Sequence, residues 1–205
     1  MNVEVWLTYV VAAIVFSFAP GSGTINSISN GMVYGWRKSL ASIVGLQLGM
    51  AVHIVLVGVG LGALVAQSTV AFSLIKWIGA VYLIWLGIQK WREQSALSID
   101  NVDKLVTAKR LFQRAVLVNL TNPKTIVFLV ALFPQFIDAT QPQLPQLLIL
   151  GGTTLIIDAC VMLFYVSLAS RFTHYIRSAT VMTRLNRIFG SMFIGCGALL
   201  ALARA

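Results

Sequence analysis

Apolar residues fall into six long blocks along the chain, separated by short polar stretches. The blocks cover residues 5–32, 40–66, 70–91, 112–136, 147–169 and 188–203. A helix of roughly 20 residues crosses the hydrocarbon core of a bilayer, which is about 30 Å thick. None of the blocks alternates apolar and polar positions as barrel strands do, and a helix satisfies its own backbone hydrogen bonds in lipid. The pattern predicts an all-α integral membrane protein with six transmembrane helices.

Composition agrees with this prediction and excludes a soluble globular domain. Of the 205 residues, 58% are hydrophobic and only 10% are charged, whereas soluble proteins average about 25% charged residues. Outside the apolar blocks no stretch is long and varied enough to form a water-facing core. We therefore expect residues 1–205 to form a single membrane domain.

The net charge of +9 reflects membrane topology and does not indicate nucleic-acid binding. Counted along the chain, the first connection between blocks holds two Lys or Arg, the third six and the fifth four, whereas the second and fourth hold none. Positively charged loops stay in the cytoplasm. The odd-numbered connections are therefore predicted to be cytoplasmic, with both termini on the opposite, outer side of the membrane.

The blocks divide into two halves of three, residues 1–91 and 112–205, joined by a predicted cytoplasmic loop at 92–111. Because three is odd, the halves enter the membrane from opposite sides, as inverted repeats require. The first block of each half is interrupted by proline, in APGSG at 19–23 and in NLTNPK at 119–124. Paired Gly or Pro interruptions at matching positions of two halves are typical of a transporter's binding site.

Asp158 is the most informative single residue, because a carboxylate near the bilayer centre is costly and normally has a partner or a cavity. Counting about 1.5 Å of rise per residue places Pro20, Pro123 and Asp158 at similar depths, so all three are predicted to line one cavity. Lys124 is the evident partner for Asp158. The sequence leaves open whether the two form a permanent structural pair or a switchable site.

The helix breaks supply groups for a zwitterionic ligand. A proline removes a backbone donor and frees carbonyls, which favour a cation, while the N-terminus of the following helix favours an anion. Gly21 keeps this backbone accessible. If each break is considered alone, a simple proline kink in a continuous helix is the alternative interpretation.

Several polar side chains lie close to the breaks in the sequence. Asn26, Asn119 and Asn122 are candidates for substrate contact, with interhelical hydrogen bonding or helix capping as the equal alternative. Gln47 resembles them. His53 lies near the middle of the second block and is a candidate for proton relay, although a buried structural histidine is the commoner case.

Three segments resemble the lysine-exporter superfamily in order and spacing: FAPGSG at 18–23, KWIGAVYLIWLG at 76–87 and NLTNPK at 119–124. Together with HIVLVGVGLG at 53–62, they are most similar to its homoserine and homoserine-lactone efflux branch. The resemblance implies a proton-driven exporter, in the bacterial inner membrane, of small amino acids and derivatives such as homoserine, homoserine lactone or threonine. In that membrane, termini on the outer side are periplasmic.

By position, the resemblance places Pro20 and Gly21 at the family's first break, residues 122–124 at its second break and Asp158 at the acidic position of its fifth helix. Ser22 replaces the family's second proline, which fits the homoserine branch and disfavours lysine or arginine export. The scarcity of His and Cys disfavours metal transport.

We therefore expect alternating access in an amino-acid antiporter that is not an enzyme and needs neither cofactor nor metal. The substrate site is predicted at Pro20, Gly21, Ser22, Asn26, Asn119, Asn122, Pro123, Lys124 and Asp158, with proton coupling at Asp158 and His53. Export of another amino acid or small metabolite is the alternative within the superfamily, and a membrane-embedded enzyme is the remote one. The small-residue pairs Gly45 with Gly49, Gly58 with Gly62 and Ser191 with Gly195 fit helix packing within the chain or a homo-oligomer.

Overall fold

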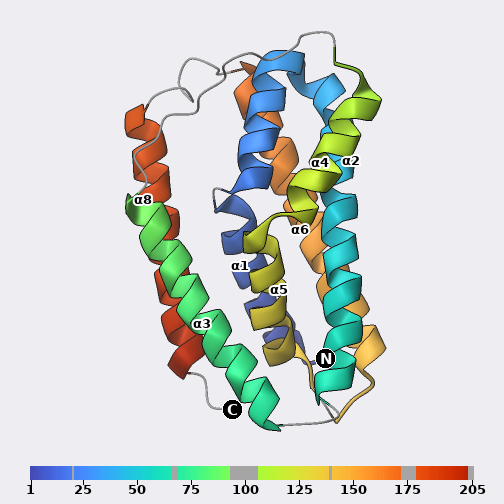
Figure 1. The fold of residues 1–205 in the computed structure, drawn as a ribbon, viewed down its shortest axis with the longest axis vertical. Helices are drawn as coiled ribbons and strands as arrows, with labels where there is room; N and C mark the ends of the chain where they lie inside the picture. Colours follow the sequence, from blue (N-terminus) through green and yellow to red (C-terminus); the bar gives the residue numbers. More distant parts are fainter. Residues whose placement is uncertain (20, 66–68, 93–105, 139, 172–178, 203–205) are drawn as a thin grey trace.

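The computed structural model describes residues 1–205 except 20, 66–68, 93–105, 139, 172–178 and 203–205. Within this part the chain is all-helical and contains no strand. The helices, shown in Figure 1, are α1 (Val3–Phe18), α2 (Ser22–Val65), α3 (Thr69–Arg92), α4 (Ala108–Leu120), α5 (Pro123–Phe136), α6 (Gln143–Arg171) and α8 (Ala179–Leu202).

Two helical stretches of the described chain, Ser22–Gly60 and Gln143–Arg171, are each long and apolar enough to cross a membrane. The pair Ala108–Leu120 and Pro123–Phe136, bent by 52°, makes a third if it is counted as one broken span. An all-helical chain with several apolar helices is what the sequence pattern predicts.

Helix α2 is two helical segments that meet at a turn. Gly35 lies inside it with φ 70°, a left-handed conformation that glycine adopts without the steric cost of a Cβ atom. Figure 1 shows the chain reversing direction there, so the segments on either side run next to each other. Asn26 and Asn30 on the first segment both donate to the Ser42 hydroxyl on the second, at 2.7 and 2.9 Å. Helix α2 therefore contains the second part of the first predicted block, after the break, and nearly all of the second block.

The two predicted helix interruptions are present. Helix α1 ends at Phe18 with Ala19 in an extended conformation, and α2 begins at Ser22. Helix α4 ends at Leu120, and α5 begins at Pro123 with Asn122 as its N-cap. Proline suits the first position of a helix, because its missing N–H would have no intrahelical partner there. Each break is thus a separate C-terminus and N-terminus, not a bend in a continuous helix.

Glycine contacts hold α2 tightly against α4. A Cβ atom at Gly45 would clash with the backbone carbonyl of Phe112, and one at Gly49 would lie 2.8 Å from Asn119 Cβ. The predicted Gly45 and Gly49 pair therefore serves packing within the chain. Gly195, by contrast, has open space at its Cβ position. The close approach between α3 and α8 is made by Gly87 and Gly190, which the sequence analysis did not single out.

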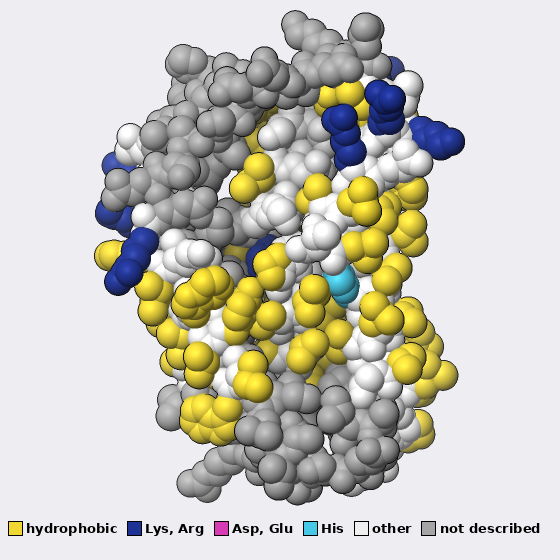
Figure 2. All heavy atoms as spheres, viewed as in Figure 1, with side chains coloured by type: hydrophobic (Ala, Val, Ile, Leu, Met, Phe, Trp, Pro, Cys, Tyr) yellow, Lys and Arg dark blue, Asp and Glu magenta, His cyan; other side chains and the backbone are white. Residues whose placement is uncertain are grey.

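Charged residues and apolar residues occupy different zones of the surface. In Figure 2, Lys and Arg side chains lie toward the end of the molecule where α4 begins, and apolar side chains cover the middle of the face. The predicted loop at 92–111 is partly helical, because α4 already begins at Ala108; residues 93–105 lie outside the described part. Helix α8 begins at Ala179, nine residues before the sixth predicted apolar block. Within these additional residues, the Arg187 guanidinium lies 5.4 Å from the centre of the Trp91 ring on α3.

Candidate functional site

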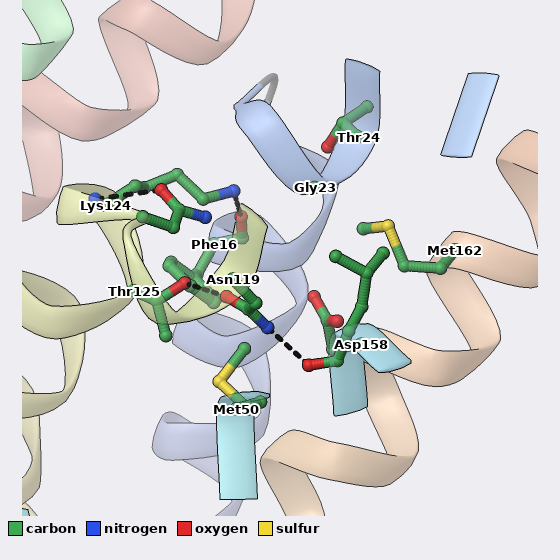
Figure 3. Close-up of a pocket in the computed structure, with 11 residues that line it drawn as sticks. Phe16, Gly23, Thr24, Met50, Asn119, Lys124, Thr125, Asp158 and Met162 are labelled. Atoms are coloured by element: carbon green, nitrogen blue, oxygen red, sulfur yellow. Dashed lines mark hydrogen bonds between the residues drawn. The ribbon is translucent and has the colours of Figure 1, made fainter. Parts of the chain in front are cut away.

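Both helix breaks face one small buried cavity of about 10 Å³, enough for about one water molecule. Its lining combines a charged pair, amide and hydroxyl groups, and apolar side chains, and Figure 3 shows the residues in place. They are Phe16, Gly23, Thr24, Leu46, Met50, Asn119, Asn122, Lys124, Thr125, Asp158 and Met162. The residues come from α1, α2, α4, α5 and α6 and from the break between α4 and α5, so the cavity lies where five helices meet.

Lys124 connects the two breaks. It lies in the first turn of α5 with 9% of its surface exposed, and its Nζ donates to the carbonyls of Phe16 at 3.0 Å and Ala19 at 2.8 Å. These carbonyls belong to the C-terminal end of α1, where the helix dipole favours a cation. The same ammonium lies 4.4 Å from the centre of the Phe16 ring. Lys124 thus caps a helix of the other half of the chain.

The approach of Lys124 depends on glycine at position 21. A Cβ atom there would lie 3.2 Å from the Lys124 Cδ and Cε atoms, closer than most such contacts. Gly21 therefore leaves room for the lysine stem as well as freeing the backbone at the break.

Amide side chains order the second break. The Asn122 Oδ1 atom accepts from the Lys124 backbone N–H at 3.1 Å and so caps α5. The Asn119 Oδ1 atom accepts from the Thr125 hydroxyl at 2.9 Å, while its amide donates to the Leu46 carbonyl on α2. His53 Nε2 lies 3.1 Å from the Asn119 carbonyl oxygen. These contacts tie the end of α4 and the start of α5 to α2.

Asp158 reaches the cavity from α6, and 5% of its surface is exposed. Its Oδ2 atom accepts a hydrogen bond of 2.8 Å from the Gln47 amide on α2. The Ser17 hydroxyl on α1 faces the same carboxylate. A buried carboxylate with few polar contacts is costly to keep charged.

The predicted site residues separate into two groups. Asn119, Asn122, Lys124 and Asp158 line the cavity, and Gly21 touches the Lys124 side chain. Asn26 instead donates a hydrogen bond to Ser42 across the α2 turn. His53 does not line the cavity itself, but its ring nitrogen contacts the carbonyl oxygen of Asn119, which does.

Two further residues of the predicted site, Ser22 and Pro123, are not among the residues that line the cavity. Pro123 and Ser22 are exposed first residues of α5 and α2. Pro20 lies outside the described residues. Pro123 begins α5 at the second break, and its sequence neighbours Asn122 and Lys124 face the cavity.

Sequence reasoning missed the apolar part of the lining and the Gln47 contact. Phe16 stacks on Phe128 with ring centres 3.7 Å apart, and Met50 and Met162 complete the apolar wall. Apolar site residues cannot be recognised from the sequence of a chain in which most positions are apolar. The signal for Gln47 was present, because an amide inside an apolar block needs a partner.

Apolar helices that meet at a buried cavity lined by a lysine, a carboxylate and two helix breaks define the class of helical membrane transporters. Within that class, the chain belongs to the LysE type translocator family, whose sequence profile matches residues 14–204.

Similar proteins cover the full length of the chain. A protein of Vibrio cholerae named uncharacterized membrane protein is 62% identical over 205 residues, all of both chains. The homoserine/homoserine lactone efflux protein of Salmonella typhi is 52% identical over 100% of this chain and 99% of its own length. The leucine efflux protein of Klebsiella pneumoniae is 32% identical over 96% and 94%. No solved structure matches the chain.

Proposed function

We propose that this protein exports small amino acids and their derivatives, namely homoserine, homoserine lactone and threonine, from the bacterial cytoplasm across the inner membrane by proton antiport. Family membership and the 52% identity with a homoserine/homoserine lactone efflux protein over the full chain support this substrate class. The observation that carries the mechanism is the cavity at which Lys124 and Asp158 meet the two helix breaks.

The cavity has complementary ends for a zwitterion. Asp158 offers a carboxylate to the substrate ammonium. Lys124 and the N-terminus of α5 offer positive charge to the substrate carboxylate. Because the Lys124 ammonium is held by backbone carbonyls of α1, it can exchange one of them for a substrate oxygen without leaving the site.

Proton coupling follows if Asp158 holds one cation at a time. A deprotonated carboxylate binds the substrate ammonium on the cytoplasmic side and releases it on the periplasmic side. A proton from the periplasm then neutralises the carboxylate for the return step, because a bare charge in the hydrocarbon region is costly. His53, which lies against the Asn119 carbonyl, is a second proton-coupling candidate.

Substrate passage requires the helices around the cavity to separate, since a cavity of about 10 Å³ holds no amino acid. We propose that two inverted halves, residues 1–91 and 112–205, move against each other in an alternating-access cycle. Reciprocal packing supports this architecture. Helix α2 of the first half packs on α4 of the second, α6 of the second packs on α1 and α2 of the first, and the last helices, α3 and α8, pack on each other.

Export of another amino acid is the alternative. The apolar lining from Phe16, Met50 and Met162 and the similarity to a leucine efflux protein favour leucine as the competing substrate. A membrane-embedded enzyme lacks a supporting observation of this kind, and the family consists of translocators.

The test is uptake of radiolabelled homoserine, threonine and leucine into inverted membrane vesicles with an acidic lumen. We expect homoserine and threonine to accumulate in vesicles that contain the protein and not in vesicles from cells that lack it. Uptake of leucine alone would replace the substrate assignment, and uptake of none of the three by correctly inserted protein would contradict the proposed function.

A further inference from the structure

Two buried oxygen atoms beside Asp158 have no hydrogen-bond partner among the described residues. They are the Ser17 Oγ atom on α1 and the Gln47 Oε1 atom on α2. Ser17 is completely buried, with 0% of its surface exposed. Leaving a buried polar atom unsatisfied costs about 1–3 kcal/mol, so such atoms call for an explanation.

The position of these atoms points to a ligand. The Gln47 side-chain nitrogen donates to Asp158 Oδ2, so the unpartnered oxygen belongs to an amide group that is bonded to the carboxylate, and the Ser17 hydroxyl on α1 faces the same carboxylate. Three helices thus contribute three groups that can accept a hydrogen bond: a hydroxyl, which can donate to the carboxylate and still accept, an amide carbonyl and the carboxylate itself. A primary ammonium group has three N–H donors, so this set matches it in number and in charge.

We infer that Ser17, Gln47 and Asp158 form an ammonium subsite that selects substrates with a free primary amine and rejects N-acylated ones. The inference rests on the proposed function and adds the specificity-determining residues Ser17 and Gln47. Homoserine, threonine and homoserine lactone share a primary ammonium, whereas the lactone has no free carboxylate. The ammonium subsite is therefore the recognition element common to all three. Acylation removes the charge and two of the N–H donors, which leaves the acceptors unsatisfied.

Competition against radiolabelled homoserine in inverted vesicles tests the subsite. In the wild-type protein, homoserine lactone is expected to inhibit uptake, and N-acetyl-homoserine lactone is expected to need at least about tenfold higher concentration. Equal inhibition by both lactones would overturn the subsite. Uptake that requires Na⁺ and not a proton gradient would also overturn it, because the three oxygens would then bind sodium.

Ser17→Ala separates a ligand-binding role from a structural role. Removing a hydroxyl that has no partner is expected to leave the thermal unfolding midpoint unchanged or raised, while the half-saturation concentration rises about tenfold for homoserine and the lactone alike. Ser39→Ala is the matched control, since Ser39 is equally buried but its hydroxyl donates to the Gly35 carbonyl at the α2 turn. Gln47→Met is the second variant and is expected to raise the same half-saturation concentration.

The outcomes distinguish the subsite from the proposed function. If wild-type vesicles take up no homoserine, the proposed function fails. If they take it up but Ser17→Ala and Gln47→Met behave like Ser39→Ala, only the subsite is wrong.

Discussion

At the scale of single residues, the site depends on a lysine and an aspartate that occupy different environments. Lys124 has backbone carbonyl partners at the end of α1, whereas Asp158 accepts a hydrogen bond from the Gln47 amide. A cation at a helix C-terminus is stabilised by the carbonyls and the dipole. A buried carboxylate that lacks a comparable set of hydrogen-bond donors is not stabilised in this way. This asymmetry supports the proposed roles, cation exchange at Asp158 and anion binding at Lys124.

Lys124→Met tests the role of the lysine. The variant keeps a long unbranched side chain but loses the charge, so uptake of homoserine and threonine is expected to fall at least about tenfold, while uptake of the lactone, which has no carboxylate, falls much less. The measurement is uptake of each compound into inverted vesicles at matched protein levels. Lys124→Arg keeps the charge and serves as the control. An equal loss for all three substrates in Lys124→Met would show that the lysine only holds the breaks together.

At the scale of helices, close backbone contacts position the site. Gly49 brings α2 against Asn119, whose side chain bonds to Thr125 on α5 and to the Leu46 carbonyl on α2. Because protein interiors are closely packed, a shift of α2 at this contact would displace the second break. The α2 and α4 contact therefore determines the geometry of the cavity.

Gly49→Ala is expected to destabilise the protein by about 1–3 kcal/mol, because the added methyl would lie 2.8 Å from Asn119 Cβ and the helices must move apart. Gly152→Ala on α6 is the control, since its Cβ position is open and alanine favours a helix over glycine. Thermal unfolding in detergent checks both. Equal midpoints for the two variants would mean that α2 and α4 do not pack as described.

The sequence predicted the helices better than the side-chain contacts. Apolar blocks and prolines located the helices and both breaks, because the cost of unsatisfied backbone groups in lipid constrains them strongly. Depth arithmetic placed Pro20, Pro123 and Asp158 at one cavity; Asp158 lines it, and so does Lys124, the residue after Pro123, whereas Pro123 does not. It could not assign Lys124 to the carbonyls of α1, or Gln47 to Asp158, because rotation of each helix about its axis and the choice between neighbouring partners depend on packing.

At the scale of the whole molecule, the distribution of charge and the direction of the helices agree. Helix α1 begins and helix α8 ends at the same end of the molecule in Figure 1, and α4, with its Lys and Arg side chains, begins at the opposite end. Under the positive-inside rule the end at which α4 begins is cytoplasmic, so the account places both termini in the periplasm.

A reporter fused to the C-terminus tests this orientation. Alkaline phosphatase, which is active only after export, is expected to be active in the fusion, while a green fluorescent protein fusion at the same position is expected to be dark. The same reporters inserted after residue 100 should give the reverse result. A fluorescent C-terminal fusion would contradict the orientation and, with it, the arrangement of the halves.

The central claim is that Asp158 exchanges a proton for the substrate. The most direct test records lumen pH in inverted vesicles with an acidic lumen when homoserine is added outside, using wild-type protein, Asp158→Asn and Asp138→Asn. Asp138 is an exposed carboxylate between α5 and α6 and serves as the control. The account predicts a homoserine-dependent rise in lumen pH for the wild type and Asp138→Asn, and none for Asp158→Asn inserted at the same level. Substrate-driven proton movement that persists in Asp158→Asn would contradict the account.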